Sequence, residues 1–332
     1  MSFQICTVGC GWIANNMHGP AYRKYAEKDG SVQLAACCDV NVRNASDFQQ
    51  KFGFARYYTD VGEMLDREKP DAVCLNTPAQ FTAELAVRIL ERGIPLILEK
   101  PPGINREEAL SILNAAEKHH VPNQVAFNRR YMPVVAKLNA SLSEKYRPQE
   151  IQNIRCDFFR VARLDRHFSE TAIHGIDTVR YLARSDYKHV TFHYQELPRL
   201  GEGVANVFME CVFRSGATGQ LAFCPVAGVA MERITVNALG DTWFANLPVW
   251  GSVDVPGRLL WYHQNKILAD LAGDTLSGGA PFETGGFYRE DASFFDEIRG
   301  GGKPDGDVGT ALQSVEIADC IRNRLPRYDF AG

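Results

Sequence analysis

From residue 4 the chain reads Gln4-Ile5-Cys6-Thr7-Val8-Gly9-Cys10-Gly11-Trp12-Ile13-Ala14. An apolar run is followed by the pattern G-x-G-x-x-A and then by a helical stretch. The first glycine allows a tight turn, the second lets the backbone approach a pyrophosphate, and the small third residue lets helix and strand lie close. The N-terminus of the helix offers free N–H groups and a positive dipole end. The residues from Gly9 to Ala14 are therefore predicted to bind a dinucleotide diphosphate.

A carboxylate at the end of the next strand supports this interpretation. Asp39 follows an apolar run at residues 33–38, where a carboxylate can accept hydrogen bonds from adenosine ribose hydroxyls. The spacing from Gly11 to Asp39 exceeds the usual ~20 residues, so we expect an extended first helix or loop. Asp39 repels the 2′-phosphate of NADP, and Arg43 partly offsets this repulsion. NAD is the favoured cofactor, with NADP as the alternative.

The first 125 residues alternate short apolar runs with amphipathic helical stretches, which is typical of β-α-β winding around a parallel sheet. Strands are expected at residues 5–8, 33–38, 72–76, 96–98 and 124–127. Helices are expected at 12–28, 43–52, 79–92 and 105–119. We predict an α/β protein whose residues 1–125 form a doubly wound Rossmann domain.

The pattern changes after residue 125. Helices are expected at 131–145, 170–183, 288–299 and 310–323, and strands at 151–160, 187–197, 204–213, 218–225, 231–239 and 243–249. Closely spaced strands separated by turn residues indicate an antiparallel arrangement. Residues 126–332 are predicted to form an α+β domain with one large, mainly antiparallel sheet.

Composition excludes several classes of protein. Hydrophobic residues make up 45% of the 332 residues and the net charge is −4, which fits a folded protein without a polyanionic partner such as nucleic acid. No apolar stretch has membrane-spanning length, and no signal-like segment begins the chain. The nine cysteines form no C-x-x-C pair and the histidines form no H-E-x-x-H motif. We expect buried free thiols, no metal and a cytoplasmic location.

Further motifs follow in a recognisable order. They are Asn76-Thr77-Pro78, Glu99-Lys100-Pro101-Pro102 and Ala172-Ile173-His174-Gly175-Ile176-Asp177. Together with the N-terminal turn, this order resembles the glucose-fructose oxidoreductase / inositol dehydrogenase / rhizopine-catabolism (Gfo/Idh/MocA) family. The segment at 126–131 looks like the family's domain-crossing segment, and Gly286-Phe287 with Phe294-Phe295 looks like its C-terminal helix. The resemblance covers essentially the whole chain.

The resemblance implies an NAD(P)-dependent oxidoreductase that acts on CH–OH groups of sugars, polyols or related hydroxy and keto compounds. It also implies that Asn76, Thr77, Pro78, Glu99 and Lys100 line the cofactor. Two alternatives stay open: a non-catalytic dinucleotide-binding regulator on the same fold, and an NAD-dependent glycosidase.

Lys100 is a candidate catalytic residue on physical grounds as well. A lysine at the carboxyl end of a parallel strand points into the crevice where α/β sheets bind ligands. Its ammonium can hydrogen-bond a substrate hydroxyl and favour the developing alkoxide. The competing interpretation is a surface lysine paired with Glu99. The cis or trans state of the bond to Pro101 is left open.

His174 is the candidate acid/base. On a helix, Glu170, His174 and Asp177 share one face, so that a carboxylate one turn away can orient the imidazole. We expect Lys100 and His174 to hold the reacting hydroxyl while His174 takes its proton. Two positions depart from the family pattern: Glu170 stands where many members have Asp, and Thr82 where many have His.

The remaining candidates concern the substrate and a second subunit. Asn128, Arg129, Tyr131, Arg160 and Arg163 are candidate substrate-binding residues, with a domain-interface role as the equal alternative. The resemblance implies a homodimer or homotetramer formed through the large sheet. The side chains expected on its exposed face are Trp243, Trp250 and Trp261.

Overall fold

The computed structural model describes residues 2–330, which divide into two compact units. Unit 1 comprises the chain up to Asn128 together with Phe287–Leu312. Unit 2 comprises Arg129–Gly286 and the chain from Gln313 onward. This division differs from the expected domains, 1–125 and 126–332, because the chain returns to unit 1 at Phe287.

Unit 1 is built on a six-stranded parallel sheet in the order β3-β2-β1-β4-β5-β6. Its strands are β1 (Phe3–Val8), β2 (Val32–Cys38), β3 (Arg56–Tyr58), β4 (Ala72–Leu75), β5 (Leu96–Glu99) and β6 (Asn123–Ala126). Its helices from the first part of the chain are η1 (Ala14–His18), α1 (Gly19–Lys28), α2 (Val42–Phe52), α3 (Val61–Glu68), α4 (Ala79–Leu90) and α5 (Arg106–His119). The predicted Rossmann fold is confirmed, and its topological switch point lies between β1 and β4.

Three details of unit 1 bear on the sequence analysis. The chain is helical from Trp12 through η1 and α1 to Lys28, which is the extended first helix expected from the distance to Asp39. The short strand β3 and the helix α3 were not predicted. The three residues of β3 read Arg-Tyr-Tyr, and so short a polar strand leaves no apolar run.

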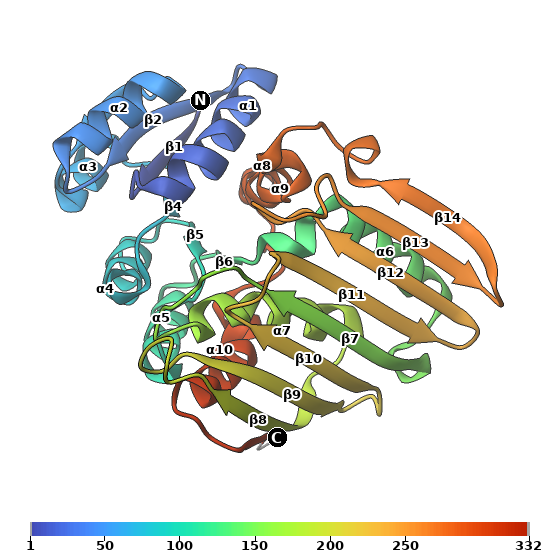
Figure 1. Ribbon diagram of the computed structural model, residues 1–332. Helices are drawn as coiled ribbons and strands as arrows, with labels where there is room; N and C mark the ends of the chain where they lie inside the picture. The colour runs from blue at the N-terminus through green and yellow to red at the C-terminus, as the bar shows by residue number, and fades with distance from the viewer. Residues whose placement is uncertain (1, 331–332) are drawn as a thin grey trace. The chain divides into compact units, whose positions relative to one another are not determined.

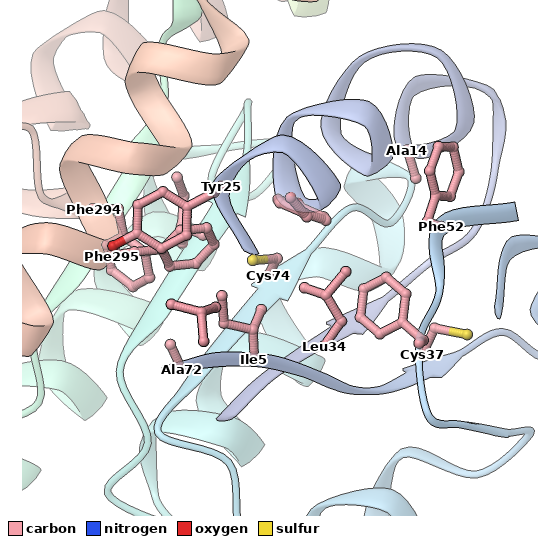
Figure 2. Close-up of a cluster of buried hydrophobic side chains, with 14 of the residues drawn as sticks. Ile5, Ala14, Tyr25, Leu34, Cys37, Phe52, Ala72, Cys74, Phe294 and Phe295 are labelled. Atoms are coloured by element: carbon pink, nitrogen blue, oxygen red, sulfur yellow. The ribbon is translucent and has the colours of Figure 1, made fainter. Parts of the chain in front are cut away.

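A helix from the C-terminal part of the chain completes the core of unit 1. Phe294 and Phe295 of α9 (Phe287–Gly300) are fully buried, and Figure 2 shows them beside Tyr25 near the strand residues Ile5 and Ala72. The ring of Phe295 lies 5.0 Å from that of Tyr25. Burying each such side chain stabilises by about 1.5–3 kcal/mol, which is why α9 belongs with unit 1. The next helix, α10 (Val308–Arg322), begins in unit 1 and ends in unit 2.

Unit 2 is built on a nine-stranded sheet in the order β14-β13-β12-β11-β7-β10-β9-β8-β15. The strands are β7 (Ile151–Phe159), β8 (Tyr187–Glu196), β9 (Ala205–Phe213), β10 (Thr218–Cys224), β11 (Met231–Ala238), β12 (Asp241–Leu247), β13 (Arg258–His263), β14 (Lys266–Ala272) and β15 (Arg327–Asp329). Only β7 and β10 pair in parallel, which confirms the predicted mainly antiparallel sheet. Strands β13, β14 and β15 were not predicted.

One face of this sheet is covered by α6 (Pro133–Lys145) and α7 (Ser169–Ala183), as Figure 1 shows. Buried and exposed residues alternate along β9, which places every second side chain under the helices. Exposed apolar side chains, among them Phe208, Val212 and Phe244, point to the other face.

The expectation for the tryptophans is wrong at two positions. Trp243 is fully buried, donates its indole N–H to Ser141 Oγ of α6 at 3.1 Å, and stacks on Trp261 at 5.4 Å. Both rings therefore belong to the helix-covered side, because the indole N–H finds its partner there. Trp250, in the loop after β12, is 71% exposed.

All nine cysteines are free thiols and eight are buried, as the scattered spacing predicted. Between residues 2 and 330, no helix combines the length and the apolar character needed to span a bilayer.

Candidate functional site

The two glycines of the N-terminal turn differ in how much room the protein leaves for a side chain. Gly9 has φ +91°, and a Cβ there would lie 2.5 Å from the carbonyl oxygen of Asn76. A Cβ on Gly11 would meet no protein atom within 4 Å. The fold therefore requires a glycine at position 9, whereas nothing in the protein itself requires one at position 11. Ala14 is fully buried in the core beneath the helix, as a small third residue should be.

Asp39 ties the end of β2 to this turn. Its Oδ2 accepts a hydrogen bond from the backbone N–H of Cys10 at 2.9 Å, and its Oδ1 accepts from that of Asn41 at 2.8 Å. Each carboxylate oxygen has further lone-pair capacity, so both can still accept ribose hydroxyls. Arg43 is exposed in the first turn of α2, and Trp12 is half-exposed at the helix start.

Asn76 of the predicted cofactor motif is occupied inside the protein. Its side-chain amide donates to Thr7 Oγ1 at 3.0 Å and to the Tyr22 hydroxyl at 3.1 Å, both buried. Thr77 Oγ1 lies 3.3 Å from Thr82 Oγ1, and Pro78 is exposed at the start of α4. The amide of Asn76 thus holds β4 against β1 and α1.

The Glu-Lys-Pro motif stands at the end of β5, as predicted for the carboxyl end of the sheet. Glu99 Oε2 accepts the backbone N–H of Lys100 at 3.0 Å, and the Lys100–Pro101 peptide is cis. The other carboxylate oxygen, Oε1, lies 3.0 Å from Nε2 of His18. Glu99 is therefore held by a buried histidine, and the expected alternative of a simple Glu99–Lys100 surface pair does not describe it.

His18 in turn is bound by Asp291 of α9, whose two oxygens lie 3.0 and 3.1 Å from Nδ1. Burial disfavours the imidazolium, but Asp291 and Glu99 outweigh it and hold the pKa of His18 well above its ordinary value. Burial likewise opposes ionisation of Glu99, but His18 outweighs it and keeps that pKa below its usual range. Neither His18 nor Asp291 was predicted.

A second polar cluster lies within unit 2. Arg129 reaches both oxygens of Glu232 at 2.8 and 3.2 Å, and Arg160 binds the same carboxylate. Glu232 is 2% exposed. Burial raises the pKa of its carboxyl, but Arg129 and Arg160 outweigh burial and lower it overall. Two candidate substrate-binding arginines thus share one buried carboxylate.

Arg129 also contacts the candidate acid/base, because its Nη1 lies 3.1 Å from Nε2 of His174. A guanidinium can only donate, so this ring nitrogen must present its lone pair. In this arrangement His174 is a neutral imidazole with its proton on Nδ1. The ring nitrogen that faces Arg129 is therefore a base rather than an acid.

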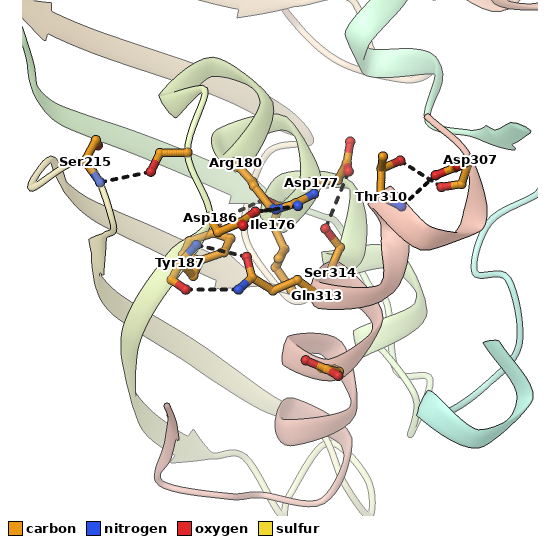
Figure 3. Close-up of polar contacts among 12 residues, drawn as sticks. Ile176, Asp177, Arg180, Asp186, Tyr187, Ser215, Asp307, Thr310, Gln313 and Ser314 are labelled. Atoms are coloured by element: carbon orange, nitrogen blue, oxygen red, sulfur yellow. Dashed lines mark hydrogen bonds and ion pairs between the residues drawn. The ribbon is translucent and has the colours of Figure 1, made fainter. Parts of the chain in front are cut away.

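The expected partnership between Asp177 and His174 is replaced by another. Asp177 forms a two-pronged ion pair with Arg130 at 2.5 and 2.8 Å and accepts from Ser314 of α10, a contact drawn in Figure 3. The carboxylate orients Arg130 rather than the imidazole. Glu170 lies one turn before His174 at the start of α7 and is partly buried.

The remaining candidates lie as follows. Asn128 is buried and Tyr131 half-buried in the short helix η2 (Asn128–Tyr131). Arg163 is exposed and pairs with Asp165 at 2.7 Å.

Three buried charged residues of these clusters were missed although the sequence carries a signal for each. Glu232 shares the inward register of β11 with Ile234 and Val236. His18 and Asp291 lie on buried helix faces, His18 in line with Tyr22 and Asp291 in line with Phe294. A charged side chain at an apolar position indicates a buried partner.

Comparison with known proteins adds a family to this geometry. Residues 3–127 match the GFO_IDH_MocA model, described as an oxidoreductase family with an NAD-binding Rossmann fold. Rhizopine catabolism protein MocA of Rhizobium meliloti is 28% identical over 136 residues, which is 41% of each chain. Myo-inositol dehydrogenase Hyg17 of Streptomyces leeuwenhoekii is 30% identical over 187 residues, 54% of this chain and 55% of that protein. The chain thus spans only about half, or less, of the length of these relatives.

Solved structures share the fold along the whole chain. Levoglucosan dehydrogenase in complex with NADH and levoglucosan superposes with a TM-score of 0.84 at 18% identity, covering 100% of both chains. GenD2 from gentamicin A biosynthesis, in complex with NAD, gives a TM-score of 0.79 at 18% identity and covers 100% of this chain and 97% of that one.

Proposed function

Because residues 3–127 match the model of the Gfo/Idh/MocA oxidoreductase family, we propose that the chain is an NAD-dependent dehydrogenase of a sugar, polyol or related hydroxy compound. The match confirms the resemblance that the motifs predicted, and the family's NAD-binding fold agrees with the predicted nicotinamide cofactor. The choice of NAD over NADP, like the substrate class, belongs to the proposal.

The observation that carries the proposal is the contrast between Gly9 and Gly11. Gly9 is explained by the protein, whereas Gly11 faces open space where a pyrophosphate would meet a Cβ. Asp39 sits beside the same turn with lone pairs suited to ribose hydroxyls. The residues present therefore fit a dinucleotide, and the acidic side chain favours NAD.

When bound, NAD⁺ accepts the hydride that leaves the substrate carbon. The Lys100 ammonium is assigned to hydrogen-bond the hydroxyl on that carbon and to stabilise the developing alkoxide. The hydroxyl proton goes to Nε2 of His174, which Arg129 must first release, because in the structure the Arg129 guanidinium occupies that lone pair. Glu170, Asn128, Tyr131, Arg160 and Arg163 remain candidates for contacts to the substrate.

The test is absorbance at 340 nm with NAD⁺ and NADP⁺ against a panel of sugars and polyols. Lys100→Ala should abolish turnover, while Lys118→Ala on the exposed side of α5 should leave it unchanged. Cofactor binding without turnover of any substrate supports the regulator instead, and product without net NADH supports the glycosidase.

Cofactor binding is tested separately by calorimetry with NAD⁺. Gly11→Ala should keep the fold and weaken binding about tenfold or more, since the new Cβ stands where the pyrophosphate lies. Asp39→Ala should reduce the preference for NAD over NADP. Unchanged affinity in Gly11→Ala would remove the main support for the dinucleotide site.

The exposed apolar face of the nine-stranded sheet is proposed as the homo-oligomer interface. Phe208 and Phe244 are 38% and 42% exposed on it. Sedimentation should show a dimer or tetramer that Phe244→Asp shifts toward monomer. A wild-type monomer at all concentrations would exclude this interface.

A further inference from the structure

The most unusual buried polar group outside the proposed reaction is His18. Its side chain is 1% exposed, and it is the last residue of η1, a π-helical turn. Such turns are rare and occur preferentially at functional sites. This one directly follows the dinucleotide turn in the chain.

The two ring nitrogens of His18 both face carboxylates. Nδ1 meets Asp291 and Nε2 meets Glu99, each at 3.0 Å. A neutral imidazole has one N–H, so one lone pair would face a carboxylate oxygen. The geometry is satisfied when His18 is an imidazolium that donates to both. His18 then joins three segments of unit 1: the first helix, the end of β5 and α9.

Tyr22 and Cys74 also lie near this cluster, but neither carries the positive charge that the two carboxylates need. Tyr22 stacks on His18 at 5.7 Å, and burial raises the pKa of its hydroxyl well above its ordinary value. Burial does the same for the thiol of Cys74, so both stay neutral. Phe287 packs edge-on against the ring, and Glu290 precedes Asp291 on α9.

The connection to Lys100 runs through Glu99. One oxygen of this carboxylate is held by His18 and the other accepts the Lys100 backbone N–H. We propose that His18 is a positioning residue: clamped by Asp291, it fixes Glu99 and thereby the backbone from which Lys100 projects. The importance of this contact for turnover rests on the proposed function, whereas the contact itself does not.

Amide hydrogen exchange at Lys100 tests the contact without any substrate. Pro101 and Pro102 carry no N–H. In a peptide that ends at Pro102, the Lys100 amide is therefore the last backbone amide that can exchange. In His18→Phe, which keeps a ring against Tyr22 but donates nothing, Glu99 is released. The Lys100 amide should then exchange about tenfold faster. His18→Leu, which also donates nothing, serves if the Phe variant does not fold.

Two further variants separate positioning from general stability. Asp291→Asn preserves the geometry, because its amide can donate to a neutral Nδ1 while Nε2–H still donates to Glu99. This variant should therefore keep slow exchange. His263→Phe breaks a histidine–carboxylate pair with Asp241 in unit 2 and should leave the Lys100 amide unaffected.

Kinetics supplies the second readout. With the substrate found by the panel, His18→Phe should lower kcat about 10²-fold, the typical effect of a small misplacement of a reacting group. Its dissociation constant for NAD⁺ should stay within about twofold. Unchanged exchange at Lys100 in a folded His18→Phe would overturn the inference. Absence of turnover in the wild type with faster exchange in the variant would instead remove the proposed function alone.

Discussion

Each unit buries a histidine against charged side chains, and the two environments are opposite in charge. His18 in unit 1 lies between the carboxylates of Asp291 and Glu99. His174 in unit 2 lies against the guanidinium of Arg129. The first ring must donate from both nitrogens, and the second must accept at one. The same side chain is thus fixed as a cation in one unit and as a neutral base in the other.

The difference shows how partners, rather than burial, decide the state of the ring, since both rings are at most 6% exposed. A cationic His18 suits a role that holds its neighbours in place. A neutral His174 suits a group that must receive a proton. Each prediction below changes one side of this contrast.

The largest effect is expected in unit 2. Glu232→Gln removes the carboxylate that Arg129 and Arg160 share, and breaking such a buried ion pair costs about 3–5 kcal/mol. Urea denaturation followed by circular dichroism measures the loss. Glu210→Gln, on the exposed face of β9, should change stability by less than about 0.5 kcal/mol. Equal midpoints for the two variants would contradict the role given to Glu232.

A smaller, pH-dependent effect is expected in unit 1. The pKa of His18 is raised on folding, so its contribution is complete below its unfolded value of 6.5 and declines as pH rises toward the folded pKa. Wild-type stability should therefore fall above pH 6.5 by up to about 1.4 kcal/mol per pH unit from this group. Denaturation midpoints between pH 7 and 9 measure the slope.

Asp291→Asn should reduce that slope, because Asp291 is the larger of the two carboxylate contributions to the raised pKa. Asp329→Asn, which alters a histidine pair at the surface, is the matched control. If Asp291→Asn keeps the wild-type slope of stability against pH, a group other than His18 titrates between pH 7 and 9.

The last prediction concerns the protonation of the two histidines in the wild-type protein. Nitrogen-15 spectra of the histidine rings at pH 7 should show two N–H protons on His18 and a single one, on Nδ1, for His174. His18→Gln and His174→Gln assign the signals. A neutral His18 or a doubly protonated His174 would reverse the comparison.

Much of the fold was predictable because its signals are local. The buried strands of unit 1 are short apolar runs, and the alternation along β9 and β11 follows the pleat of a half-covered sheet. β14 escaped prediction because its residues are mostly exposed, which leaves no buried stripe to detect.

The candidate site was predictable only where one motif holds the whole group. The turn from Gly9 and the position of Lys100 at the end of β5 follow from local sequence. The clusters around His18 and Glu232 join residues 273 and 103 positions apart, and no local pattern specifies such pairs. The helical spacing of Asp177 and His174 was real, but Arg130 competes successfully for the carboxylate.

The return of α9 to unit 1 has a consequence for how this protein can be cut. The stretch that matches the family model, residues 3–127, ends long before Phe294 and Phe295. Expressed as an excised fragment, it would present the aromatic surface of Tyr22 and Tyr25 to water without its cover. Residues 3–127 are therefore not expected to fold stably on their own. A gene fusion or truncation that keeps it must also carry the helix encoded near the other end.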